Sequence, residues 1–151
     1  MVAVRLIFIA SLLFACGFTP PEGGNIEDRP NAAPPTGRDL IVGVWTWTLP
    51  SNGCNEVYRY YADGKLAVIS GEEVVLGNYQ IAAQPNESGR YKLTDTIRVD
   101  HPGIDCAGQN VDLAGDSATI YIRFHESGNA YWPMYSPSGD SGFGPLFRVA
   151  H

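Results

Sequence analysis

Hydrophobic and polar residues alternate in short runs from Asp39 to the end of the chain, with turn-forming residues between the runs. Strict alternation over four to eight residues is typical of half-buried β-strands. In residues 41–49 (IVGVWTWTL), the alternation places Trp45, Trp47 and Leu49 on one face. The further expected strands are NEVYRYY (55–61), KLAVIS (65–70), VVLGNYQI (74–81), RYKLT (90–94), DTIRVD (95–100), ATIYIRFHE (118–126), AYWPMY (130–135) and LFRVA (146–150).

The connections between these runs are short, and no segment has a sustained helical period. Short links favour pairing between strands that follow one another, which gives an antiparallel meander. A meander of this size removes its exposed edges by closing on itself. The pattern predicts an all-β fold, a single antiparallel meander β-barrel of about eight to nine strands, with a β-sandwich as the alternative.

The first fifteen residues have the features of a secretory signal peptide. Arg5 is followed by an apolar stretch from Leu6 to Leu13, which is too short to span a bilayer. The sequence Leu13-Phe14-Ala15-Cys16 resembles the lipobox of bacterial lipoproteins. The resemblance implies cleavage before Cys16 and lipidation of its thiol, with no retention signal at Gly17 and therefore an outer-membrane location facing the periplasm. The alternatives are an ordinary signal peptide and a secreted or cell-surface protein.

Residues 17–38 contain five prolines and four glycines and almost no large apolar side chains. Such a segment cannot bury enough surface to offset the entropy lost on ordering. We therefore expect a signal peptide at 1–15, a lipidated cysteine and disordered linker at 16–38, and one β-barrel domain at 39–151. The linker would hold the domain away from the lipid surface.

The three cysteines of an exported chain leave an odd thiol unless one is modified. With Cys16 lipidated, Cys54 and Cys106 form the natural disulfide pair in an oxidising compartment. A metal site is the alternative, but these two cysteines lack the CxxC spacing of zinc ligands. We predict no metal site and no cofactor.

Removal of residues 1–15 leaves nine basic and sixteen acidic residues. Binding of nucleic acid needs a basic surface that replaces counterions, and none is visible in the sequence. The composition therefore argues against a nucleic-acid partner.

At Gly43-Val44-Trp45 the chain resembles the Gly-x-Trp signature of lipocalins and related calycins, and residues 56–68 (EVYRYYADGKLAV) resemble a hairpin of small lipocalin-like bacterial proteins. In that family the tryptophan closes one end of the barrel and a late arginine packs across it, a position that Arg148 matches. The resemblance implies a lipocalin-like barrel, expected as a monomer, that binds a small hydrophobic ligand or an envelope component.

Aromatic residues supply the candidate ligand-binding side chains, because they combine apolar surface with polar groups that orient a ligand. The alternative is that they form only the core. The candidates are Trp45, Trp47, Tyr58, Tyr60, Tyr79, Tyr91, Trp132 and Tyr135. The loops at 101–116 and 136–145 are candidate recognition surfaces or simple connections.

No catalytic signature stands out. Glu72 and Glu73 fall in an expected hairpin turn, where both carboxylates would be solvated, and adjacent residues such as Asp100 and His101 point to opposite faces of a strand. The sequence lacks a nucleophile elbow, a phosphate-binding loop and an HExxH motif. We therefore expect a non-enzymatic envelope lipoprotein with a binding function, or alternatively a periplasmic inhibitor or immunity protein that binds another protein.

Overall fold

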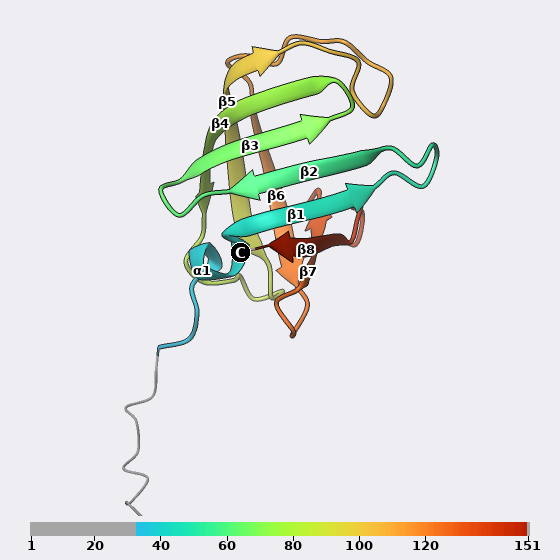
Figure 1. Cartoon of the computed structure of the whole chain (residues 1–151). Coiled ribbons are helices and arrows are strands. Elements are labelled where there is room, and N and C mark those ends of the chain that lie inside the picture. The colour runs from blue at the N-terminus through green and yellow to red at the C-terminus, as the bar shows by residue number, and fades with distance from the viewer. Residues whose placement is uncertain (1–32, 151) are drawn as a thin grey trace, which may run out of the picture. The chain divides into compact units, whose positions relative to one another are not determined.

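A computed structural model describes residues 33–150 of the chain. The predicted signal peptide, Cys16 and most of the predicted linker lie outside the described residues. The part that is described forms a closed β-barrel with one short helix (Figure 1).

The barrel consists of eight strands, as the sequence pattern predicted. Each strand is antiparallel to the next, and β1 pairs with β8 to complete the ring. The strands are β1 (Gly43–Thr48), β2 (Asn55–Tyr60), β3 (Lys65–Ser70), β4 (Glu73–Ile81), β5 (Tyr91–His101), β6 (Ser117–Phe124), β7 (Ala130–Met134) and β8 (Leu146–Ala150).

The expected strands at 90–94 and 95–100 are one continuous strand, β5, of eleven residues. A bulge interrupts its pairing with β4: Val99 lies opposite Leu76 and Ile97 lies opposite Gly77, so that Arg98 is the extra residue. A bulge bends a strand and increases its twist, which helps a long strand to curve around a barrel. The bulge also explains why β5 shows no single alternating period along its length.

The helix α1 (Gly37–Ile41) begins inside the predicted linker, so the ordered region starts before Asp39. Thr36 caps the helix, since its hydroxyl accepts from the Asp39 backbone while the Asp39 carboxylate accepts from the Thr36 backbone. This helix is not predicted from the sequence, because five residues are too few to show a repeating helical pattern. No helix among residues 33–150 is long and apolar enough to cross a membrane.

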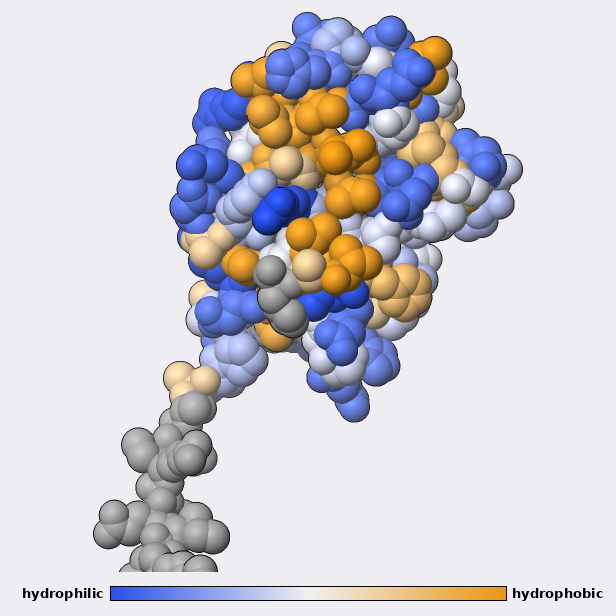
Figure 2. Space-filling view, viewed as in Figure 1, coloured by the Kyte–Doolittle hydropathy of each residue, from blue (hydrophilic) through white to orange (hydrophobic). Residues whose placement is uncertain are grey.

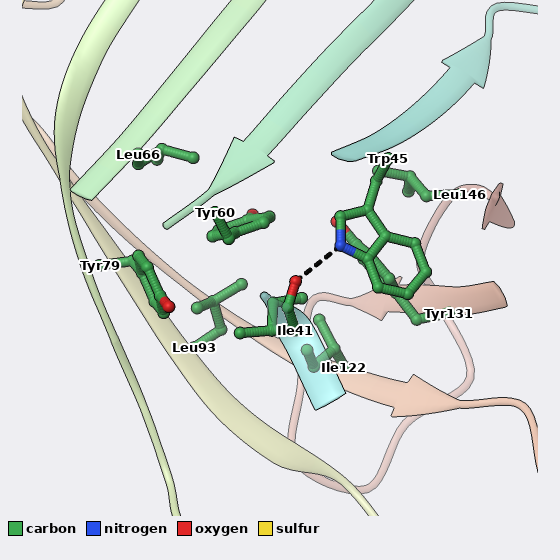
Figure 3. Packing of buried hydrophobic residues seen from close by; sticks show 9 residues of the cluster. All are labelled: Ile41, Trp45, Tyr60, Leu66, Tyr79, Leu93, Ile122, Tyr131 and Leu146. Carbon is green, nitrogen blue, oxygen red and sulfur yellow. Dashed lines mark hydrogen bonds between the residues drawn. The ribbon is translucent and has the colours of Figure 1, made fainter. Parts of the chain in front are cut away.

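The buried core lies inside the barrel, and α1 contributes to it (Figure 3). Four of its nine members are aromatic, and Trp45 lies edge-on to Tyr131 with 4.7 Å between ring centroids. The core residues are Ile41, Trp45, Tyr60, Leu66, Tyr79, Leu93, Ile122, Tyr131 and Leu146.

The predicted disulfide between Cys54 and Cys106 is present. It joins the end of the β1–β2 connection to the long β5–β6 loop, over a sequence separation of 52 residues. The link fixes this loop, which otherwise contains no regular secondary structure, to the rim of the barrel.

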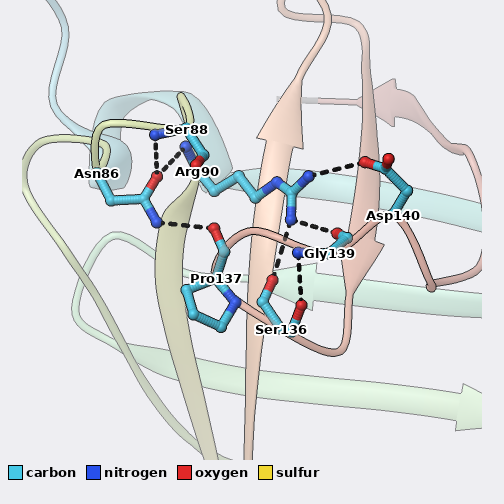
Figure 4. Close-up of polar contacts among 7 residues, drawn as sticks. All are labelled: Asn86, Ser88, Arg90, Ser136, Pro137, Gly139 and Asp140. Atoms are coloured by element: carbon cyan, nitrogen blue, oxygen red, sulfur yellow. Dashed lines mark hydrogen bonds and ion pairs between the residues drawn. The ribbon is translucent and has the colours of Figure 1, made fainter.

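The loop that joins β7 to β8 is held against the β4–β5 connection (Figure 4). Arg90 is buried, and its guanidinium donates to the backbone carbonyls of Ser136 and Gly139 and lies 3.1 Å from the Asp140 carboxylate. The Asn86 side chain donates to a further carbonyl of the same loop at 3.0 Å. These bonds give the loop a defined conformation.

Candidate functional site

The two ends of the barrel differ in how they are filled. One end contains α1 together with the β2–β3, β4–β5 and β6–β7 connections, and we call it the packed end. The other contains the β1–β2 and β3–β4 hairpins and the β5–β6 loop.

Trp45 and Arg148 close the packed end. The Trp45 side chain is fully buried, and its indole Nε1 donates to the backbone carbonyl of Ile41 at 2.7 Å. The guanidinium carbon of Arg148 lies 4.1 Å from the centroid of the Trp45 rings. Arg148 also donates to the carbonyls of Val42, at 2.6 Å, and Leu40. The arginine contact expected from the lipocalin resemblance is therefore found at this tryptophan.

The helix α1 bridges two hairpins across the packed end. Arg38 donates to the carbonyl of Ala62 at 3.0 Å, and the Gly37 backbone donates to the carbonyl of Ala83 at 3.0 Å. A side chain at position 37 would clash, because an added Cβ would lie 2.2 Å from the Ala82 carbonyl oxygen. The backbone of α1 therefore packs directly against the β4–β5 connection at this end.

A cavity of about 620 Å³ lies in the other half of the barrel, and we call it the acidic cavity. Its volume is in the range of small-molecule binding sites. The residues that line it are Glu56, Tyr58, Leu66, Val68, Ser70, Glu73, Val75, Asp95, Ile97, Asp105, Leu113, Asp116, Ser117 and Ala118.

The lining is arranged in rows by the strand register. Glu56, Ser70 and Glu73 lie directly opposite one another on β2, β3 and β4, and they form the row nearest the β3–β4 hairpin. The next row on the same face lies two residues further along each strand and consists of Tyr58, Val68 and Val75. A polar row therefore lies nearer the hairpins and an apolar row lies beneath it.

Two hydroxyl groups hold the carboxylate of Glu56. The Tyr58 hydroxyl donates to Oε2 at 2.6 Å, and the Ser70 hydroxyl donates to Oε1 at 2.8 Å. Burial, followed by the charge of Glu56, raises the pKa of Tyr58 well above its usual value, so the phenol remains a donor. Glu56 is thus a fixed acceptor on the cavity wall.

The disulfide-linked loop supports this arrangement. The backbone N–H of Cys106 donates to the Ser70 hydroxyl at 3.0 Å, and the Asn52 side chain donates to the Cys106 carbonyl at 2.7 Å. Ser70 therefore receives one bond from the loop and gives one to Glu56. The disulfide, which fixes Cys106, helps to set the position of a cavity carboxylate.

Glu73 is buried although it carries a carboxylate: only 6% of the residue is exposed. The expectation that Glu73 is solvated in a turn is therefore wrong. Burial raises the pKa of Glu73, and the carboxylates of Asp100, Asp105 and Glu56 raise it further. No hydrogen-bond donor or basic side chain contacts the Glu73 carboxylate among residues 33–150.

Asp95 lies deeper, on β5. Burial raises its pKa to about 7, an effect that a hydrogen bond with the Tyr60 hydroxyl partly offsets. Its Oδ1 atom is buried and has no hydrogen-bond partner. A buried polar atom without a hydrogen-bond partner is unfavourable, so Asp95 destabilises the folded protein when it is charged.

The β5–β6 loop borders the cavity with Asp105, Leu113 and Asp116. Asp105 accepts from the backbone of Gln109 at 2.7 Å, and Asp100 accepts from the backbone of Leu113 at 2.6 Å. Within residues 33–150, no three His, Cys, Asp or Glu side chains are grouped so that they could hold a metal ion. The carboxylates are spread around the cavity instead of meeting at one point.

The eight predicted aromatic candidates do not form one site. Only Tyr58 lines the acidic cavity. The buried residues Trp45, Tyr60 and Tyr79 belong to the core, with Trp47 and Tyr91 packed against it. Trp132 contacts His125 and Arg123, and Tyr135 is 62% exposed beside Phe143.

The acidic residues of the cavity were not among the predicted site residues. One sequence signal identifies Glu73: if Gly71 and Glu72 form a two-residue turn, Glu73 pairs with Ser70 and faces the same side as Val75. The structure has this pairing, and Gly71 has a φ of +61°, which suits the first central position of a tight hairpin turn.

No family model, curated protein or solved structure matches this chain.

Proposed function

We propose that the chain is a lipid-anchored binding protein of the bacterial cell envelope. In this proposal Cys16 carries the lipid, residues 17 to about 33 act as a linker, and the lipocalin-like barrel takes a small ligand with an apolar body into the acidic cavity. The protein acts by binding and performs no catalysis.

The acidic cavity is the observation that carries this proposal. Its volume of about 620 Å³ accommodates a small organic molecule, and Leu66, Val68, Val75 and Ile97 supply apolar wall. Burial of apolar ligand surface contributes about 25 cal/mol per Å². The packed end needs no ligand for its stability, because side chains and α1 already fill it.

Filling the cavity tests the proposal. In Val68→Phe the larger side chain is expected to occupy space that the ligand needs. Ile69→Phe is the matched control, because Ile69 is the next residue on β3 and is 46% exposed. Fluorescence titration with the neutral probe N-phenyl-1-naphthylamine should show saturable binding to the unmodified protein and to Ile69→Phe. We expect at least tenfold weaker binding by Val68→Phe at an unchanged melting temperature.

An absence of probe binding to the unmodified protein, or equal binding by both variants, would contradict a ligand site in the barrel. Native mass spectrometry of protein extracted from envelopes adds an independent measurement, since it detects any ligand that copurifies.

The lipid anchor has its own test. Cys16→Ser removes the only thiol that the lipobox resemblance assigns to acylation, and it should move the protein from the membrane fraction to the soluble fraction. Unchanged fractionation would contradict the anchor while leaving the cavity argument intact.

An alternative function, binding of another protein, has one structural observation in its favour. Ile69, Leu76 and Val99 are 46%, 40% and 42% exposed on the outside of the barrel, and apolar side chains gather over β2 to β4 in Figure 2. Exposed apolar patches mark interaction surfaces in many proteins. A photo-crosslinking residue at Leu76 should then capture a defined protein partner in cells, and Leu76→Glu should abolish its binding.

A further inference from the structure

We propose that the acidic cavity selects an organic cation, a protonated amine or quaternary ammonium group attached to an apolar body. This inference rests on the proposed ligand-binding function and names its ligand class. It is drawn from the charge, burial and arrangement of the cavity residues.

The charge of the lining has a single sign. Five of the cavity residues are carboxylic acids, and none is Lys, Arg or His. Charges of one sign inside low-dielectric walls focus the electrostatic potential and concentrate ligands of the opposite sign. An anionic ligand would meet repulsion without a compensating base.

Glu73 supplies a second and independent observation. Its side chain lines the cavity at 6% exposure and has neither a hydrogen-bond donor nor a basic partner among the described residues. The Glu73 carboxylate is therefore free to accept from an ammonium group in the cavity, a charge-assisted bond. Asp95, deeper in the same lining, has a buried Oδ1 atom without a hydrogen-bond partner, which is unfavourable and which a bound donor would relieve. The nearby Glu56 is already fixed by Tyr58 and Ser70, so little ordering is needed for it to accept a further bond.

The rows of the cavity fit an amphipathic molecule. Glu56 and Glu73 flank Ser70 in the outer row, while Val68 and Val75 lie in the row beneath them. A ligand with its ammonium group between the two carboxylates would place its apolar body against the valines.

Two other ligand classes fit less well. A small metal ion needs several ligands that converge on one point, and no such group of residues exists in the described part of the chain. A zwitterionic lipid headgroup would bring a phosphate into a cavity without a basic side chain. The favoured ligand is therefore an organic cation that carries no phosphate or other anionic group.

Three probes with the same alkyl chain and different headgroups test the inference. Calorimetric titrations of the purified protein with octylamine, octanol and octanoate at pH 7.5 and low salt should give a dissociation constant at least tenfold lower for octylamine than for octanol. Octanoate should show no measurable binding, and lyso-phosphatidylethanolamine should not displace octylamine.

Equal affinity for octylamine and octanol would overturn the cation preference and leave the ligand-binding function standing. Tighter binding of octanoate, or displacement of octylamine by the lysolipid, would also overturn it. A failure of every probe to bind would remove the ligand-binding function and the inference together.

Charge-neutral variants locate the interaction. Glu56→Gln and Glu73→Gln should each weaken octylamine binding by about tenfold and leave octanol binding unchanged. The matched control is Glu72→Gln, which alters net charge equally at an exposed neighbour of Glu73 and should have no effect. If Glu72→Gln weakened octylamine binding as much as Glu73→Gln, the interaction would be general surface attraction and the site would be wrong.

Discussion

The packed end and the acidic cavity are two halves of one barrel built from the same strands, yet they are filled in different ways. At the packed end, Trp45 is fully buried, hydrogen-bonded to Ile41 and covered by Arg148. In the cavity, Glu73 is only 6% exposed, and its carboxylate has no partner among residues 33–150. Trp45 thus has its polar group satisfied within the fold, whereas the Glu73 carboxylate is left free to bind a ligand.

The comparison indicates that the packed end mainly stabilises the fold and that the cavity end mainly binds a ligand. A closed ring of strands satisfies its backbone by strand pairing, so the fold does not depend on filling both ends. The packed end supplies tight contacts, and the cavity end can then carry unfavourable charges. Substitutions in the two halves are therefore expected to have different consequences.

The largest effect on stability is expected at the packed end. Trp45→Ala removes a buried indole, its bond to Ile41 and the surface on which Arg148 packs, which should lower the free energy of unfolding by about 4 kcal/mol. Trp132→Ala, on the partly exposed Trp132, should cost much less. Urea unfolding followed by circular dichroism measures both. Equal losses would show that Trp45 has no special role in closing the barrel.

Loss of the disulfide should have the next largest effect on stability, and it should also weaken ligand binding in the acidic cavity. A cross-link over a sequence separation of 52 residues is expected to contribute about 3 kcal/mol. Cys54→Ser with Cys106→Ser also frees the loop that binds Ser70, so we expect lower stability together with weaker octylamine binding. A loss of stability with unchanged affinity would contradict the link between this loop and Glu56.

Asp95 should make the protein less stable as the pH rises. Its folded-state pKa of about 7 lies above the ordinary value of 3.8, so its contribution to stability is complete below about pH 4 and is lost as the pH rises to about 7. The Asp95 charge interacts with four nearby phenols, and the pKa of each phenol is raised, so none of them titrates between pH 4 and pH 8. These are Tyr58, Tyr60, Tyr79 and Tyr131.

Asp95→Asn should therefore be the more stable protein at pH 8, by a few kcal/mol, and should differ little from the unmodified protein at pH 4. Glu73, whose pKa is also raised, stays in the variant and leaves a smaller pH dependence of the same sign. Thermal melts from pH 4 to pH 8 measure the difference. A variant that is less stable at pH 8 would show that the charged form of Asp95 is stabilised in the fold.

The smallest effect on stability is expected at Ser70. Ser70→Ala removes one donor to Glu56 and leaves the Cys106 backbone N–H without its acceptor, at a cost of about 1 kcal/mol. The Glu56 carboxylate should become more mobile, and octylamine binding should weaken a few-fold. Unchanged affinity would indicate that Tyr58 alone positions Glu56.

Much of the fold follows from the sequence, because strand alternation is a local pattern and the number of cysteines can be counted directly. The alternation around Trp45 predicts a strand with one buried face, and the pairing of Cys54 with Cys106 follows from the number of cysteines and from the expected oxidising compartment. The α1 helix is not predicted because its five residues span less than two turns, too few for a repeating apolar pattern. The bulge at Arg98 was missed because the pairing with β4, a long-range property, determines it.

The candidate site was harder to predict because it depends on strand register. Aromatic content pointed to residues that mostly form the core, whereas the cavity is lined by carboxylates whose facing depends on where each strand begins. A shift of one residue in the β3–β4 turn would turn Glu73 outward and Glu72 inward. Apart from Glu73, whose facing the Gly71–Glu72 turn indicates, the acidic lining depends on a register that only the closed barrel defines.

The most direct test of the difference between the two ends is a nitrogen-proton correlation spectrum of the protein titrated with octylamine. We predict saturable shifts for the backbone amides of Val68, Val75 and Ala118, which line the cavity, and an unmoved indole signal from Trp45. Shifts confined to the outer face around Ile69 and Leu76, with the cavity amides unchanged, would contradict the assignment of the site to the barrel interior.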